Sequence, residues 1–267
     1  MSRWSWDPTL YAGSAAHYAR GRAPYPEELA TAVVDGVGLG GGERLLDVGC
    51  GPGSLTLLLA PHVGSAVGLD PDPGMLAVAS AAATERGLGR VSWVRARAED
   101  LPAGLGPVDL VTFAQSFHWM ERDRVAATVR TMVPDGGALV HVHASTHGGD
   151  PVPGRPAPSW DRITALVERY LGPGLRAGRG TRPPGAGGDE PEVYGRAGFT
   201  HQRRLEVPGA RITRDPATVL DAVHSLSYAA PHLFGDRLAA FDADLLALIG
   251  PDPLTEQLPA IEVDVYR

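Results

Sequence analysis

Residues 45–56, LLDVGCGPGSLT, decide the fold of this chain. The apolar first half is typical of a short buried strand, and the second half is a glycine-rich turn that opens a helix. Gly49, Gly51 and Gly53 carry no Cβ atom, so a ligand can lie directly against the backbone. The N–H groups of such a turn and of the following helix start favour an anionic group. The stretch therefore predicts a strand–turn–helix unit that binds a ligand.

A second apolar run, residues 65–69 (SAVGL), ends in Asp70. An acidic residue about 20 positions past the glycines, at the tip of a second strand, can accept hydrogen bonds from both ribose hydroxyls. The two stretches together predict a nucleoside-bearing cofactor. The glycines are spaced G-x-G-x-G rather than G-x-G-x-x-G, which argues against a nicotinamide-dependent oxidoreductase.

The glycine pattern behind Asp47 resembles motif I of the class I S-adenosylmethionine-dependent methyltransferases. Five other segments also resemble sequences of this family. Residues 68–76, 98–102 and 133–139 are similar to its later motifs, and residues 18–26 (YARGRAPYP) and 114–119 (AQSFHW) to its trans-aconitate methyltransferase-like branch. The resemblance covers roughly residues 14–145. It implies S-adenosyl-L-methionine as cofactor, S-adenosyl-L-homocysteine as its product, and a small molecule as acceptor.

Predicted strands and helices alternate along the first part of the chain, which favours an α/β fold with a parallel sheet and right-handed crossovers. We expect strands at 44–48, 65–70, 91–95, 108–114 and 137–144, and helices at 54–60, 73–87 and 122–132. Further on we expect helices at 160–171 (with Ser159 as its cap), 216–227 and 235–249, and strands at 200–207 and 260–266. The resemblance implies a Rossmann-like, doubly wound, seven-stranded sheet that is mostly parallel with an antiparallel last strand.

We expect residues 1–267 to form a single methyltransferase domain with three regions. An N-terminal lid covers 1–30, a cofactor-binding core covers 31–145, and an acceptor-side region covers 146–267. Within the last region, 209–256 is expected to be a helical insertion that caps the acceptor pocket. Segments 147–158 and 172–191 are rich in Gly and Pro and are expected to be mobile loops.

The composition narrows the class of protein. The chain has 267 residues, 43% of them hydrophobic, and a formal net charge of -7, which is typical of a globular protein. The acidic balance argues against a nucleic-acid partner. We find neither an apolar run of about 18 residues nor an apolar signal core, so we expect a cytoplasmic protein without membrane contact, as a monomer or homodimer. All 24 basic residues are Arg, consistent with a GC-rich bacterial genome and a role in secondary metabolism.

The resemblance also assigns cofactor contacts. The three glycines lie against the methionine portion, Asp70 binds the ribose, and Asp47 orients the turn or the methionine amine. Ala98 and Glu99 lie on the adenine side, where Arg97 replaces an Asp common in related enzymes and leaves acidic recognition of adenine open. An Arg fork suits a carboxylate, so Arg22 is expected to close over the cofactor's carboxylate. The full set of expected cofactor contacts is Tyr18, Arg22, Asp47, Gly49, Gly51, Gly53, Asp70, Pro71, Met75, Ala98, Glu99, Gln115 and Ser116.

The residues after the fourth strand are expected near the transferring methyl group. His118 is the first candidate for acid/base work or acceptor orientation, with Gln115 as the second catalytic candidate. The single cysteine, Cys50, is expected to pack, and the His141–His143–His147 series lacks a carboxylate set for a metal, so we predict no metal site. The expected acceptor-binding residues are His118, Trp119, His143, His147, and the pair His224 and Tyr228, one turn apart on a predicted helix.

Methyl transfer from a sulfonium mainly requires the nucleophile, the methyl carbon and sulfur to be held in line. A base is needed only where the acceptor must lose a proton. O-methylation of a carboxylate or hydroxyl is the leading expectation, and N- or C-methylation of a natural product stays open. Two further functions are compatible with the sequence. One is a cofactor-binding enzyme that catalyses a cyclisation or rearrangement without methyl transfer, and the second is a non-catalytic binding module.

Overall fold

The computed structural model describes residues 7, 9–173, 176–177, 180–181 and 188–267. Parts of the expected lid (1–6 and 8) and of the expected loop at 172–191 therefore lie outside the described residues. The chain divides into two compact units, each of which is assembled from three separate segments. Unit 1 comprises residues 1–24, 145–184 and 209–259, and unit 2 comprises residues 25–144, 185–208 and 260–267.

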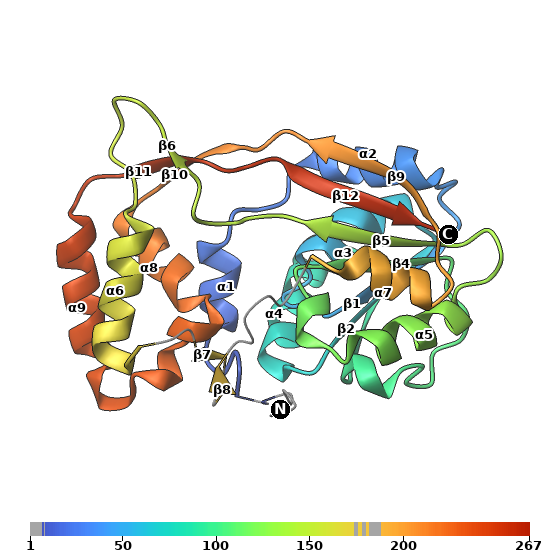
Figure 1. Ribbon diagram of the computed structural model, residues 1–267, viewed down its shortest axis with the longest axis horizontal. Coiled ribbons are helices and arrows are strands. Elements are labelled where there is room, and N and C mark those ends of the chain that lie inside the picture. Colours follow the sequence, from blue (N-terminus) through green and yellow to red (C-terminus); the bar gives the residue numbers. More distant parts are fainter. Residues whose placement is uncertain (1–6, 8, 174–175, 178–179, 182–187) are drawn as a thin grey trace. The chain divides into compact units, whose positions relative to one another are not determined.

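Unit 2 is built on a seven-stranded sheet in the order β3-β2-β1-β4-β5-β12-β9 (Figure 1). Strands β1 to β5 pair in parallel, and β12 is antiparallel to both of its neighbours, β5 and β9. The predicted α/β fold with a mostly parallel sheet and an antiparallel last strand is thus confirmed. The strands are β1 (Arg44–Val48), β2 (Ser65–Asp70), β3 (Val91–Arg95), β4 (Leu110–Ala114), β5 (Ala138–His143), β9 (His201–Val207) and β12 (Ile261–Tyr266).

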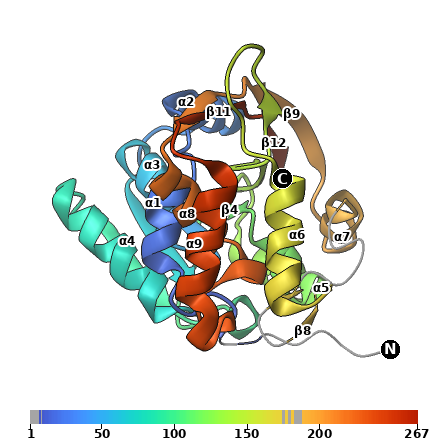
Figure 2. The ribbon, with the colours of Figure 1, turned by 90° about the vertical axis from the view of Figure 1, so that its left-hand side faces the viewer.

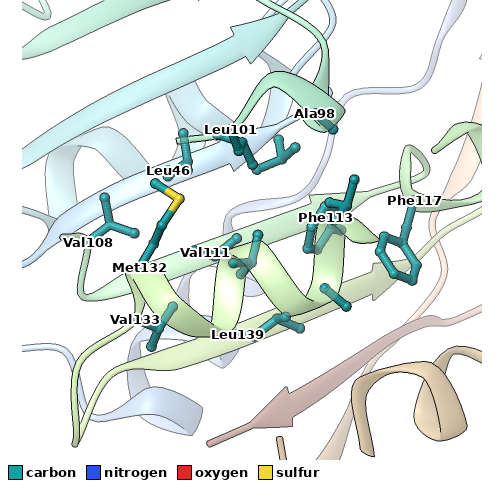
Figure 3. Packing of buried hydrophobic residues seen from close by; sticks show 14 of the residues in the cluster. Leu46, Ala98, Leu101, Val108, Val111, Phe113, Phe117, Met132, Val133 and Leu139 are labelled. Carbon is teal, nitrogen blue, oxygen red and sulfur yellow. The ribbon is translucent and has the colours of Figure 1, made fainter. Parts of the chain in front are cut away.

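Two hydrophobic cores cover the two faces of this sheet, because successive residues of a strand point to opposite sides. Leu45 of β1 packs with helices α2 and α3, whereas Leu46 packs with α5 and α7. Figure 3 shows the second core, in which Leu46, Val111 and Leu139 of three strands meet Met132 of α5. The helices of unit 2 are α2 (Glu27–Val37), α3 (Ser54–Leu59), α4 (Pro73–Glu85), α5 (Arg122–Met132) and α7 (Glu190–Arg196).

Three 3-10 helices connect these elements in the described part of the chain. η2 (Ala98–Asp100) and η3 (Phe117–Trp119) follow the carboxyl ends of β3 and β4, where candidate ligand residues lie, and η1 (Ala60–His62) precedes β2. Helix α4 begins as predicted, since the Asp72 side chain accepts hydrogen bonds from the N–H groups of Gly74 (2.7 Å) and Met75 (3.0 Å).

Unit 1 contains four helices in its described part, α1 (Ala15–Gly21), α6 (Trp160–Leu171), α8 (Pro216–His224) and α9 (Leu238–Ile249). Figure 2 shows α6, α8 and α9 side by side, and their shared core includes Ile163, Val219 and Phe241. Helices α1 and α8 approach backbone to backbone, because a Cβ atom on Gly21 would lie 2.1 Å from the Ala222 nitrogen.

Unit 1 also contains short strands that the sequence analysis did not predict. They form a sheet of β10 (Arg211–Arg214), β11 (Leu254–Gln257) and β6 (Asp150–Pro151), and a pair of β7 (Arg176–Ala177) with β8 (Gly180–Thr181). Strands of two to four residues are too short to show an alternating pattern. Three more 3-10 helices, η4 (Ser227–Ala229), η5 (Pro231–Leu233) and η6 (Gly235–Arg237), precede α9.

Two other expectations about local structure were wrong, and the expected cap of α6 is confirmed in its position only. Helix α7 begins at Glu190, inside the segment expected to be a loop. Ser159 occupies the N-cap position of α6, but among the described atoms its side chain makes no capping hydrogen bond. Helix α8 ends at His224 rather than at residue 227, because the His224 ring bonds the Ala229 carbonyl and turns the chain back.

No helix in the described ranges has both the length and the apolar character needed to cross a membrane.

Candidate functional site

The N–H groups of the glycine-rich turn hold the turn in place. Those of Gly49 and Cys50 both donate to the Leu69 carbonyl, at 2.8 and 3.1 Å. The N–H of Gly51 donates to Asp70 Oδ2 (2.9 Å), and that of Gly53 donates to the Cys50 carbonyl (3.0 Å). These four N–H groups of the turn are thus bound within the protein, by β2, the Asp70 carboxylate and the turn's own backbone. An anionic ligand at the start of the following helix stays a prediction.

The three glycines differ in what their missing Cβ atoms allow. All three have positive φ, of 71°, 54° and 81°. A Cβ on Gly49 would lie 2.5 Å from the Ser116 Cβ, and one on Gly53 would lie 2.7 Å from the Trp93 ring. A Cβ on Gly51 would have no described atom within 4 Å. Gly49 and Gly53 are therefore required by packing, and Gly51 is the one beside open space.

Asp70 lies at the carboxyl end of β2, where ligands of such sheets bind. Its carboxylate is 9% exposed and accepts hydrogen bonds from the N–H groups of Gly51 and Asp72, both at 2.9 Å. A carboxylate oxygen can accept more than one hydrogen bond, so each still has capacity for a hydroxyl donor. Burial raises the pKa of Asp70 to about 6 despite the two N–H donors. The carboxylate is thus oriented and partly desolvated before any ligand arrives.

Asp47 is fully enclosed by the protein. Its Oδ1 accepts a hydrogen bond from the Thr112 hydroxyl (2.8 Å) and its Oδ2 accepts one from the Thr56 hydroxyl (2.6 Å). The side chain is 1% exposed, and burial raises its pKa. Asp47 therefore joins β1, α3 and β4 from inside the fold. Thr56 and Thr112 were not predicted as site residues, since each is marked in the sequence only as a hydroxyl residue inside an apolar run.

The adenine-side residues form the short helix η2. Ala98 is its first residue, so its N–H has no acceptor within that turn. Glu99 is 7% exposed, with Oε1 bound by the Glu121 N–H (2.9 Å) and Oε2 3.1 Å from the Arg97 guanidinium. Both carboxylate oxygens of Glu99 are thus engaged by the protein. Within the described residues the buried Arg97 Nε has no hydrogen-bond partner.

The chain leaves β4 through a strained residue. Gln115 is exposed and has φ of +55°, a left-handed conformation that is uncommon outside glycine and concentrates at functional sites. The next residue, Ser116, is 6% exposed and donates through its hydroxyl to the Val48 carbonyl at 2.6 Å, which ties the ends of β4 and β1 together. His118 and Trp119 follow in η3, both half-buried, with ring centroids 4.8 Å apart.

Two expected cofactor residues near α4 occupy different environments. Met75 is 2% exposed and belongs to the buried side of the helix. Pro71 is half-buried, and its carbonyl accepts a hydrogen bond from Arg95 Nε at 3.4 Å. Cys50 is buried as expected, and burial raises the pKa of its thiol well above the usual value.

The two histidines of β5 stack with ring centroids 4.2 Å apart. His141 is buried, its Nδ1 is 2.8 Å from the Tyr194 hydroxyl, and burial lowers its pKa to about 3. The ring of His143 is 35% exposed, and its Nε2 lies 3.6 Å from the buried Asp264 carboxylate. In the described ranges no three His, Cys, Asp or Glu residues are grouped so that they could hold a metal ion.

The remaining predicted site residues lie in unit 1. Arg22 stacks on Tyr18, with the guanidinium carbon 4.8 Å from the ring centroid, and lies 3.2 Å from His147. His224 is 1% exposed, with Nδ1 bonded to the Ala229 carbonyl (2.9 Å) and Nε2 to Asp242 (2.7 Å). Tyr228 lies in η4, beyond the end of α8, so the prediction that His224 and Tyr228 share a helix face was wrong.

Part of the chain is similar to known proteins. Residues 45–137 match a family of proteins described as methyltransferase domain. Trans-aconitate 2-methyltransferase of Streptomyces avermitilis is 35% identical over 138 residues, which cover 49% of this chain and 48% of that protein. The probable S-adenosylmethionine-dependent methyltransferase CRG1 of Saccharomyces cerevisiae is 31% identical over 128 residues, covering 47% and 43%. The chain thus spans about half the length of these curated relatives.

A solved structure is similar in fold over more of the chain than residues 45–137. The crystal structure of the YcgJ protein from Bacillus subtilis superposes with a TM-score of 0.53 and 16% identity, covering 91% of this chain and 99% of that one. At that identity the likeness concerns the fold alone. The family match shows that residues 45–137, which include strands β2 to β4 and nearly all of β1 of the seven-stranded sheet, are a methyltransferase domain.

Proposed function

We propose that this protein transfers the methyl group of S-adenosyl-L-methionine to an oxygen of a small-molecule acceptor. The observation that carries the proposal is the arrangement of Asp70 and Gly51 at the carboxyl end of β2. An oriented carboxylate, bound by the Gly51 N–H at 2.9 Å, lies next to a glycine with open space at its Cβ position. The Asp70 carboxylate could accept hydrogen bonds from both hydroxyls of a ribose. The missing side chain of Gly51 would leave room for the same ligand against the backbone.

The cofactor residues fit this group with distinct roles. Asp70 would accept hydrogen bonds from the ribose hydroxyls, the Ala98 N–H would face the adenine ring, and the methionine portion would pass over Gly51. Asp47 would support the turn from the protein interior and would not contact the cofactor, since both of its oxygens accept hydrogen bonds from threonine hydroxyls. Met75 and Ser116 would likewise support the site through packing, because they are 2% and 6% exposed.

The cofactor supplies an activated methyl group when it is bound, so the protein's main task is alignment. Gln115 and His118 lie just past β4 and would orient the acceptor there, with Trp119 as an apolar wall. A carboxylate acceptor needs no base, whereas a hydroxyl acceptor would give its proton to His118. Similarity to a protein named trans-aconitate 2-methyltransferase supports a carboxylate acceptor. Action in the cytoplasm, as a monomer or homodimer, stays a prediction from the sequence.

The direct test is a mass-spectrometric screen. Purified protein and S-adenosylmethionine are incubated with pools of carboxylic acids, phenols and amines, and S-adenosylhomocysteine release and product mass are followed together. Equal amounts of S-adenosylhomocysteine and an O-methylated acid or phenol would support the proposal. A methylated amine would move the accepting atom to nitrogen. An isomeric product without mass gain would favour a rearrangement, and a failure to bind S-adenosylhomocysteine in calorimetry would reject the proposal.

A substitution separates chemistry from packing at His118. His118→Ala should lower kcat while the Kd for S-adenosylhomocysteine changes less than about twofold, if the ring contacts the acceptor rather than the cofactor. His62→Ala, in the short helix η1, is the matched control. Unchanged turnover in His118→Ala would leave His118 as a packing residue.

A further inference from the structure

The indole ring of Trp93 packs against the glycine-rich turn of unit 2. Trp93 lies in β3, directly beside Gly68 in the pairing of β3 with β2. A Cβ atom on Gly68 would lie 2.4 Å from its Cζ3 atom and 2.5 Å from its Cε3 atom, and one on Gly53 would lie 2.7 Å from its Cη2 atom. The six-membered part of the indole therefore fills the space that two missing side chains leave.

The two halves of the turn are held in different ways. Residues 49–51 are bound to β2 by three backbone N–H donors. The N–H of Gly53 instead donates to the Cys50 carbonyl within the turn (3.0 Å), and the Gly53 carbonyl accepts from the Leu57 N–H of α3 (2.8 Å). The contact of Gly53 with β3 is the packing of the Trp93 ring. Removal of that ring would leave space into which this half of the turn can relax.

The side chain of Cys50 belongs to the same packed cluster. Its Sγ atom would lie 2.9 Å from a Cβ on Gly68, the glycine that the Trp93 ring also covers. Gly68 is in the middle of β2 and is not among the residues with positive φ. The close approach of the ring and the sulfur, rather than the backbone conformation, therefore requires a glycine at this position.

This cluster supports the residues that the proposed function places against the cofactor. Gly51 lies between the two turn residues that pack in the cluster, and its N–H binds Asp70 Oδ2 at 2.9 Å. Asp70 Oδ1 has a separate donor, the Asp72 N–H, also at 2.9 Å. A shift of the turn would therefore displace the Gly51 backbone but leave Asp70 with one of its two donors. The ligand portion over Gly51 should be affected more than the ribose.

We propose that Trp93 is a positioning residue for the cofactor. Its ring fixes the turn at Gly53 and so keeps the Gly51 backbone in the place that the methionine portion of the cofactor requires. The inference rests on the proposed function, which assigns that portion to Gly51. Trp93 acts through the turn and not by touching the ligand. A binding site that is fixed before the ligand arrives does not have to be ordered on binding, which increases affinity.

Two neighbouring substitutions in β3 separate positioning from general packing. Trp93→Leu removes the ring from the turn. Val94→Ala is the matched control, because residue 94 points to the opposite face of the sheet and packs with the core there. Calorimetry on the full chain measures the Kd for S-adenosylhomocysteine and for 5′-methylthioadenosine, which lacks the amino-acid portion. Urea unfolding measures the stability of each variant.

Trp93→Leu should weaken S-adenosylhomocysteine binding by about tenfold and 5′-methylthioadenosine binding by less than about threefold. Val94→Ala should lower stability and leave both Kd values within about twofold of the wild type. Trp93→Phe has a shorter ring that still covers Gly68 but reaches less far toward Gly53. It should weaken S-adenosylhomocysteine binding by about two- to fivefold, and it keeps the test decisive if Trp93→Leu does not fold.

A substitution in β2 reaches the same contact from the other side. Gly68→Ala places a methyl group against the ring and should also weaken S-adenosylhomocysteine binding. In the double variant with Trp93→Leu, the methyl group occupies space that the ring has left. The loss of affinity should therefore be smaller than the product of the two single losses. A double variant whose loss equals that product would contradict a shared contact.

An unchanged Kd for S-adenosylhomocysteine in a folded Trp93→Leu variant would overturn the proposal, and so would an equal loss for both ligands. Hydrogen–deuterium exchange of the unliganded protein tests the step that needs no ligand. The amides of residues 49–55 should exchange faster in Trp93→Leu than in Val94→Ala, and equal rates would refute the role of the ring. The proposed function fails separately, if the wild-type protein does not bind S-adenosylhomocysteine. The exchange rates then still decide whether Trp93 positions the turn.

Discussion

The candidate ligand residues of the two units carry charges of opposite sign. Among the described residues, neutral groups are the hydrogen-bond partners of the carboxylates in unit 2 and of Arg22 in unit 1. In unit 2, the partners of Asp47 and Asp70 are threonine hydroxyls and backbone N–H groups, and neither carboxylate pairs with a basic side chain in the described part of the chain. In unit 1, the partners of Arg22 are hydroxyls, a carbonyl and a neutral ring. An acidic site suits a cationic, hydroxyl-bearing ligand, and a basic site suits an anion. We therefore expect the two units to favour ligand groups of opposite charge.

The largest effect is expected in unit 1, where a substitution leaves a buried arginine without its carboxylate partner. Glu256→Gln leaves Arg214 buried without its counter-charge, so the free energy of unfolding should fall by about 3–5 kcal/mol. Urea unfolding followed by circular dichroism measures the change. Asp244→Asn removes an exposed ion pair of the same unit and should change it by less than about 1 kcal/mol. Equal effects of the two substitutions would contradict the role of Glu256.

In unit 2, a pair of glycine substitutions distinguishes a glycine required by packing from one that leaves room for a ligand. Gly49→Ala adds backbone strain and a Cβ 2.5 Å from Ser116, so the free energy of unfolding should fall by about 2–4 kcal/mol. Gly51→Ala adds strain alone, at about 1 kcal/mol, but places a methyl group in the space left for the ligand. Its main effect should be weaker binding of S-adenosylhomocysteine. Tight binding by a folded Gly51→Ala protein would mean that the ligand lies elsewhere.

Asp70→Ala removes the carboxylate that is expected to bind the ribose. The affinity for S-adenosylhomocysteine should fall by about 1–3 kcal/mol through lost charge-assisted hydrogen bonds. Calorimetry measures the loss, and Asp123→Ala, which disrupts an exposed ion pair on α5, is the control. If both variants bind alike, Asp70 does not contact the ribose.

The smallest expected effect is a pH dependence of the same binding step. The ionised form of Asp70 is the one expected to accept the ribose hydroxyls. Burial raises the pKa of Asp70 to about 6, so the ionised fraction falls as the pH drops through 6. Affinity should therefore decrease by about tenfold from pH 7 to pH 5, which corresponds to about 1.4 kcal/mol. Asp70→Asn should remove most of this dependence. A profile that keeps the same midpoint in that variant would assign the titration to another group.

Local pattern was enough to predict the sheet of unit 2. Strands β1, β2 and β3 begin and end at the predicted residues, because each is a short apolar run that ends at a glycine-rich or charged turn. The placement of Asp47 could not be predicted in the same way. Its partners Thr56 and Thr112 lie 9 and 65 residues away, and a sequence pattern does not show whether a carboxylate faces a ligand or the interior.

Unit 1 was harder to predict because its contacts are distant in sequence. Arg22 and Ser225 are 203 residues apart, and Arg22 and Thr146 are 124 apart, so no local spacing links them. The error over His224 and Tyr228 has a similar cause. The prediction assumed one continuous helix, whereas the bond from the His224 ring to the Ala229 carbonyl closes a tighter turn.

The position of β12 has a consequence for synthesis on the ribosome. This strand fills the gap between β5 and β9, yet the whole 209–259 segment is made after β9 and before it. At about 5–20 residues per second, the edge of β9 waits roughly 3–10 s for β12, and the edge of β5 waits roughly 6–24 s. Unpaired edges of this kind attract other chains. The nascent protein therefore passes through an aggregation-prone interval, in which chaperones that cover strand edges would raise its yield.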